Sequence, residues 1–142
     1  MKEMYRTYGN DVQFYIVYIR EAHALDSRSP MGGDGNPMIE DPVTLDERNK
    51  VAQVCLTKLE LEMIPALVDD MDDTANNAYA AWPDRFYLVG RDGTIVYHGG
   101  RGPFGFLPDE LEQAILKELG PDYVPTDSGE EKPEMENIFD GS

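Results

Sequence analysis

The sequence predicts an α/β domain in which helices cover a small mixed sheet. Val12–Ile19 is dominated by β-branched and aromatic side chains with almost no polar alternation, which is typical of a strand buried on both faces at the centre of a sheet. The segments that follow alternate between helical and extended patterns, as a βαβ unit requires. At 142 residues and 41% hydrophobic composition, the chain is long enough to bury one core.

The charge and the cysteine count exclude several classes of partner and site. A formal net charge of −16 disfavours binding to nucleic acid or to an anionic membrane surface. No apolar run approaches the length of a membrane span, and the first residues lack the apolar core of a secretory signal, so we expect a cytoplasmic protein. The single cysteine, Cys55, excludes an intramolecular disulfide and a Cys-only metal site.

The first half of the chain predicts two helices around the strand. Lys2–Tyr8 has the spacing of the end of a helix, and residues 24–42 carry no period and form a long loop. Thr44 and Glu47 form a capping box that begins a helix running to about Leu59. The residues of this helix predicted to face inward are Leu45, Val51, Ala52, Cys55 and Leu59.

The second half predicts a parallel strand, a hairpin and a covering helix. The expected elements are a strand at Ile64–Val68, a turn of helix at Asn76–Ala81, hairpin strands at Phe86–Val89 and Thr94–His98, and a helix at Pro108–Leu119. Asp92 and Gly93 are expected to supply the positive φ values that the hairpin turn requires. Asp69–Asp73 resembles an acidic metal-binding motif, but a solvated turn is the commoner outcome, and we expect no metal.

The predicted elements define one domain and a tail. The domain covers residues 1–124, and residues 125–142 are acidic, poor in apolar side chains and expected to be disordered. The order of elements is the thioredoxin plan without its first strand and most of its first helix. We therefore expect a three-layer, thioredoxin-like fold that is shortened at the N-terminus, with a mixed sheet, a C-terminal β-hairpin and a covering helix.

A titratable cluster follows the predicted central strand. Arg20, Glu21 and His23 come at its carboxyl end, where open α/β sheets place their ligand sites. A histidine beside a carboxylate in such a place is a plausible proton shuttle. Gly99–Gly105 forms a loop that can bring backbone close to a ligand. These residues are the first candidates for a site.

Four stretches of the chain carry a resemblance to a known family. They are VYIREAHALD at Val17–Asp26, TLDER at Thr44–Arg48, NNAYAAWPDRFYLV at Asn76–Val89 and DGTIVYHGGRGPFGF at Asp92–Phe106. Together they resemble the iodothyronine deiodinase family, a branch of the thioredoxin-like redoxins. The resemblance extends from Tyr8 to about Leu119 and covers most of the domain.

The resemblance implies a thiol- or selenol-dependent oxidoreductase. Its reaction would be reductive dehalogenation, or peroxide or disulfide reduction, with a small-molecule substrate and an external thiol as reductant, and no further cofactor. The family's selenocysteine or cysteine nucleophile would lie upstream of Met1, so we expect the full-length protein to start earlier. A selenocysteine codon taken for a stop would explain a late start, and a degenerate relative is the other explanation.

The resemblance also assigns roles to particular residues. Glu21 and His23 match the family's EAH, which implies proton transfer and substrate holding. Arg101 matches the arginine of the glycine-rich loop, which implies a contact with the carboxylate of the substrate. Arg85 lies where an arginine would stabilise a thiolate or selenolate. Cys55 is left as either a core residue or a resolving thiol.

The substrate, the catalytic role and the oligomeric state are left open by the sequence. Pro42 stands where the vertebrate enzymes carry a second histidine, which puts specificity for iodothyronines in question. The competing function is a redoxin-like domain that binds a partner or a small ligand without catalysis. The missing central strand would also expose a sheet edge, which favours pairing with a second copy in a homodimer.

Overall fold

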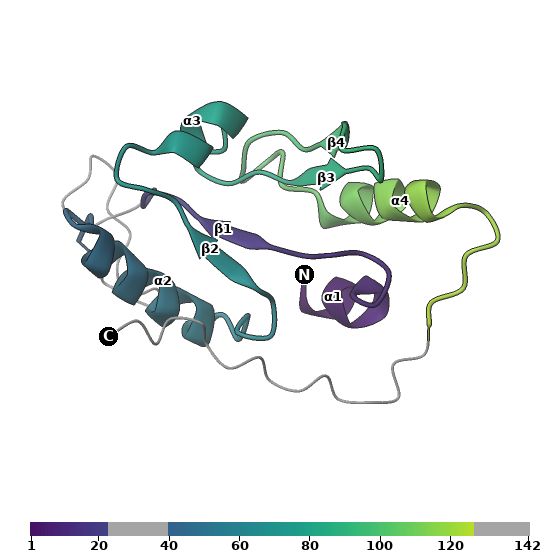
Figure 1. Ribbon diagram of the computed structural model, residues 1–142, viewed down its shortest axis with the longest axis horizontal. Coiled ribbons are helices and arrows are strands. Elements are labelled where there is room, and N and C mark those ends of the chain that lie inside the picture. The colour runs from purple at the N-terminus through teal and green to yellow at the C-terminus, as the bar shows by residue number, and fades with distance from the viewer. Residues whose placement is uncertain (23–39, 127–142) are drawn as a thin grey trace.

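The computed structural model describes residues 1–22 and 40–126, and within them the chain has a mixed α/β fold (Figure 1). The elements in chain order are α1 (Lys2–Tyr8), β1 (Ile16–Tyr18), α2 (Leu45–Lys58), β2 (Ala66–Val68), α3 (Thr74–Tyr79), β3 (Tyr87–Val89), β4 (Ile95–His98) and α4 (Pro108–Leu119). Each predicted helix and strand is present, although the strands are shorter than expected. His23 and most of the predicted tail lie outside the described residues.

The described strands form two separate two-stranded sheets. β1 and β2 run parallel, with Ile16 opposite Ala66. β3 and β4 run antiparallel, with Tyr87 opposite His98. Figure 1 shows the two pairs side by side, with α2 beside the parallel pair and α4 beside the hairpin. Parallel and antiparallel pairing are both present, but within the described residues no ladder joins the two pairs into one sheet.

The prediction that the first strand is buried on both faces is wrong. Its ladder covers three residues, and the side chains of Tyr15 and Val17 are 59% and 44% exposed. The physical reason is that, among the described residues, β1 has a hydrogen-bonded neighbour on one side only, β2, so fewer elements cover it than cover a central strand. Phe14, just before the strand, is 7% exposed and belongs to the core.

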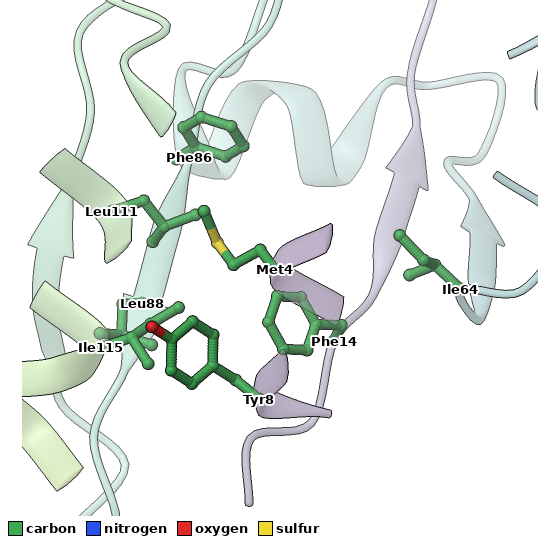
Figure 2. Close-up of a cluster of buried hydrophobic side chains, with 8 residues drawn as sticks. All are labelled: Met4, Tyr8, Phe14, Ile64, Phe86, Leu88, Leu111 and Ile115. Carbon is green, nitrogen blue, oxygen red and sulfur yellow. The ribbon is translucent and has the colours of Figure 1, made fainter. Parts of the chain in front are cut away.

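The core lies where α1, β3 and α4 meet (Figure 2). Its buried side chains are Met4, Tyr8, Phe14, Ile64, Phe86, Leu88, Leu111 and Ile115. In Figure 2 Met4 and Tyr8 of α1 point toward Leu111 and Ile115 of α4, whereas Ile64 stands apart from this group. Leu111 and Ile115, four residues apart on α4, therefore form the inward face of this helix.

The start of α2 is confirmed in atomic detail. The Thr44 hydroxyl accepts from the Glu47 amide at 3.2 Å, and the Glu47 carboxylate accepts from the Thr44 amide at 3.2 Å, so the predicted capping box is complete. The predicted inward stripe is wrong at the two ends of the helix. Ala52 is 2% exposed, but Leu45 and Leu59 are 47% and 60% exposed. The helix is about 21 Å long and β2 only about 10 Å, so the ends of α2 overhang the strand beneath it.

The hairpin turn differs from the prediction in one residue. Gly93 has the expected positive φ, +85°, but Asp92 does not. Asp92 instead accepts hydrogen bonds from the amide and the hydroxyl of Thr94, at 3.0 and 2.7 Å. These bonds hold the pKa of the Asp92 carboxyl below its usual value. The turn is thus closed by one flexible glycine and one carboxylate.

Candidate functional site

The carboxyl end of β1 contacts two later segments of the chain. The guanidinium of Arg20 lies 5.6 Å from the centroid of the Trp82 ring, which is a cation–π distance. Its Nη1 lies 3.9 Å from Oδ2 of Asp73, at the start of α3. The end of β1, the start of α3 and the segment after α3 therefore meet at one edge of the parallel sheet.

A buried arginine from α2 holds this edge in place. The side chain of Arg48 is 3% exposed, and its Nη1 donates to Oδ1 of Asp73 at 3.0 Å and to the backbone carbonyls of Asp69 and Asp70. Its Nε finds no acceptor among the described residues. A buried charge of this kind requires partners, and the acidic loop after β2 supplies them.

The acidic loop begins with a carboxylate that organises α3. Asp69 is 5% exposed, and its two oxygens accept from the amides of Ala75 and Asn76 at 2.8 Å each. A carboxylate at a helix N-terminus accepts hydrogen bonds from the free amides, and its negative charge interacts favourably with the positive end of the helix dipole. The prediction of a solvated turn is therefore wrong at Asp69. In residues 1–22 and 40–126 no cluster of three or more His, Cys, Asp or Glu side chains is arranged to hold a metal ion.

Glu21 acts electrostatically on the thiol of Cys55. Burial and, to a smaller extent, the charge of Glu21 raise the pKa of Cys55 to about 11, while the charge of Lys58 acts in the opposite direction. The structure therefore connects the end of β1 with α2, which the sequence alone did not suggest. At neutral pH the thiol is protonated, and a protonated thiol is a poor nucleophile.

The two arginines assigned by resemblance lie on loops that are bonded to each other. The Gly102 amide donates to the Asp84 carbonyl at 3.1 Å, which joins the loop of Arg101 to that of Arg85. A Cβ added at Gly102 would lie 1.7 Å from the Asp84 carboxylate, so any larger residue there would force the Asp84 side chain to move. Arg85 is half-buried, and its Nε finds no acceptor within the described part of the chain, whereas Arg101 is exposed.

A chain of contacts thus joins several predicted site residues along one edge. It runs from Arg20, the neighbour of Glu21, to Trp82 and then through the bonded loops to Arg101. Sequence reasoning missed the part played by Trp82. Its signal was present, because it is the sole tryptophan of the chain and stands in one of the four matching stretches. His23 lies outside the described residues, so its place at this edge stays a prediction.

The guanidinium and indole groups at this edge suit particular kinds of ligand group. Arginine guanidinium groups pair with carboxylates, and an indole ring stacks on aromatic groups or cations. The fold and the site together define a class of protein: a mixed α/β domain that carries arginine side chains at the end of a parallel strand.

Comparison with known proteins supplies the family. A sequence model of the iodothyronine deiodinase family, described as "Iodothyronine deiodinase", matches residues 1–119. Thyroxine 5-deiodinase of Sparus aurata is 38% identical over 104 residues, which are 73% of this chain and 37% of that protein. The human enzyme of the same name is 35% identical over 104 residues, 73% of this chain and 33% of that protein. The chain therefore belongs to the iodothyronine deiodinase family.

The chain covers a limited part of these relatives. It spans 37% of the length of the Sparus aurata protein and 34% of the Ovis aries one. Within residues 1–22 and 40–126, none of the helices has both the length and the apolar character needed to cross a bilayer.

Proposed function

We propose that residues 1–142 form the substrate-holding part of a thiol- or selenol-dependent oxidoreductase of the deiodinase type. The observation that carries this proposal is the family match over residues 1–119, together with relatives named thyroxine 5-deiodinase. In reductive deiodination a carbon–iodine bond is replaced by a carbon–hydrogen bond. Iodide leaves, the new hydrogen arrives as a proton, and the two electrons come from two external thiol groups that are oxidised together to one disulfide.

The nucleophile of this reaction is proposed to lie outside residues 1–142. Cys55 is the single cysteine of the chain, and its pKa of about 11 makes it a poor source of thiolate at neutral pH. The proposed full-length fold is thioredoxin-like. The parallel β1–β2 pair, the β3–β4 hairpin and the helix α4 support that architecture, because they occur in the order that the plan requires.

Four of the predicted site residues have a role in this proposal. Glu21 and His23 manage the proton that replaces iodide. Arg101 pairs with the substrate carboxylate, and Arg85 stabilises the anionic nucleophile. The contact of Arg20 with Trp82 supports a binding edge at this place, because it joins the end of β1 to the segment that leads to Arg85.

Trp82 offers a direct test, because its fluorescence reports on this edge alone. Thyroxine titrated into the 142-residue chain is expected to quench tryptophan emission in a saturable manner. Arg101→Ala is expected to weaken binding about tenfold, which corresponds to the loss of one charge-assisted pair. Arg91→Ala is the matched control, since Arg91 is exposed in the β3–β4 turn.

Two outcomes would contradict the proposal. Absence of saturable quenching, with the protein shown to be folded by circular dichroism, would remove the binding role. Iodide release from thyroxine by residues 1–142 with dithiothreitol would show that the nucleophile lies inside this chain, and not outside it.

A non-catalytic redoxin-like binding domain is the second candidate. The protonated state of Cys55 favours it, because the chain then has no reactive thiol of its own. A thiol-peroxidase assay separates the two cases. Activity in this chain that disappears with Cys55→Ser would make Cys55 the nucleophile and contradict both proposals.

A further inference from the structure

The loop between β4 and α4 displays one phenylalanine to solvent. Phe104 is 93% exposed, the largest exposed fraction among the large apolar side chains of the described residues. Phe106, two residues later, is partly buried and stacks on Phe86 with the ring centroids 3.9 Å apart. Phe86 belongs to the core that Figure 2 shows. Phe106 therefore fastens the loop to the core, whereas Phe104 faces solvent.

Backbone contacts fix the shape of this loop. The Gly105 amide donates to the Arg101 carbonyl at 2.8 Å, which closes a turn that contains Phe104. A Cβ added at Gly105 would lie 2.3 Å from the carbonyl carbon of Gly100, so the two sides of the loop approach as closely as glycine allows. The conformation that exposes Phe104 is therefore held by the backbone. Because the loop is already ordered, a ligand that contacts this ring has little conformational entropy to remove from it.

The same turn carries a cation and an aromatic ring. Arg101, to which the proposed function assigns the carboxylate of the substrate, begins the turn, and Phe104 is its fourth residue. Both residues are exposed. A guanidinium pairs with a carboxylate, and a phenyl ring packs on another aromatic ring in an offset or edge-to-face arrangement. The turn thus offers complementary groups to a molecule that carries a carboxylate and an aromatic ring.

We propose that Phe104 is a specificity-determining residue that stacks on an aromatic ring of the substrate, while Arg101 pairs with the carboxylate of the same molecule. Together the two residues select aromatic carboxylates over aliphatic ones. This inference rests on the proposed function, because it takes from it the role of Arg101.

The charge of the chain and the size of the turn favour a small ligand as the partner of Phe104. A formal net charge of −16 disfavours an anionic lipid surface. A single turn also offers far less area than the roughly 800 Å² that each partner buries in a stable protein complex. A small aromatic molecule needs no larger surface than the ring and the guanidinium provide.

Thyroxine is the probe, and quenching of Trp82 fluorescence gives its dissociation constant. Phe104→Leu keeps an apolar side chain but removes the ring, and it is expected to raise the dissociation constant about threefold to tenfold, the range for an aromatic pair. Phe104→Tyr keeps the ring and is expected to bind within about twofold of the unchanged chain. Val124→Ala truncates another highly exposed apolar side chain and is the control, with no change in affinity expected. Circular dichroism checks that each variant is folded.

The outcomes separate this inference from the proposed function. If the folded, unchanged chain shows no saturable quenching, the proposed function fails and the inference fails with it. If thyroxine binds and Arg101→Ala weakens binding, but Phe104→Leu binds as tightly as the unchanged chain, only the inference is overturned. An equal loss of affinity in Phe104→Tyr and Phe104→Leu would also overturn it, because the ring would then not be the group that matters.

A lipid surface is the other place where an exposed phenylalanine can insert, and vesicles of phosphatidylcholine test it. The chain is expected to stay in solution when these vesicles are sedimented. Sedimentation with the vesicles that Phe104→Ala abolishes would overturn the inference, because the ring would then serve to contact lipid.

Discussion

Nη1 of Arg48 lies 3.0 Å from Oδ1 of Asp73, and this partly buried ion pair joins two helices that are distant in the sequence. Arg48 lies at the end of the first turn of α2, and Asp73 is the N-cap of α3. The second carboxylate oxygen of Asp73 lies near Arg20, at the end of β1. One aspartate thus connects the framework of the domain with the candidate site.

Arg48→Met is expected to destabilise the fold by about 3 kcal/mol, because it leaves buried acceptors without their donor. Urea unfolding followed by circular dichroism measures the loss. Arg91→Met, at an exposed position in the hairpin turn, is the control and should change stability by less than about 0.5 kcal/mol. A loss below about 1 kcal/mol for Arg48→Met would show that the pair does not support the edge.

Asp69→Ala is expected to cost about 2 kcal/mol, because the amides of Ala75 and Asn76 lose their acceptor. Thermal unfolding measures the effect. The same change at Asp72, an exposed residue of the same loop, is the control. Equal melting temperatures for the two variants would mean that Asp69 has no special role at the start of α3.

Cys55 is expected to react slowly with iodoacetamide at pH 7 and about tenfold faster for each pH unit up to its pKa of about 11. Glu21→Gln removes a charge that raises the pKa of Cys55, so the rate curve should shift to lower pH. Lys58→Gln should shift it to higher pH, because the lysine charge lowers this pKa. If Glu21→Gln left the rate curve unchanged, Glu21 at the end of β1 would not lie close enough to the Cys55 thiol to affect its pKa.

Alkaline stability is expected to depend on Tyr8. Burial, and then the hydrogen bond to Glu112 at 2.7 Å, raise the pKa of Tyr8 from 10.0 to about 12. The stabilisation is therefore complete below about pH 10 and is lost as pH rises through 12. Tyr8→Phe should flatten the fall in stability between these values, measured by urea unfolding. Tyr15→Phe, at an exposed site, is the control and should show the same fall in stability as the unchanged protein.

The order of elements followed from local patterns in the sequence. The capping box of Thr44 and Glu47 begins α2, and the apolar spacing of Leu111 and Ile115 marks the inner face of α4. The family followed from short motifs of the same local kind. Such signals are confined to a few neighbouring residues, so they can be recognised without knowing what packs against them.

The environments of the strands and of the site were decided by tertiary structure. The apolar run at Val12–Ile19 predicted burial on both faces, but burial depends on neighbouring elements, and in the part of the chain that the structure describes β1 pairs with one strand, β2. The sequence pattern predicted that Asp69 lies in a solvated turn, but in the folded chain its carboxylate accepts hydrogen bonds from two amides of α3. Sequence by itself determined the elements and the family, because both are local. Tertiary packing decided the ion pair of Arg48 and the pKa of Cys55, since each depends on residues far apart in the chain.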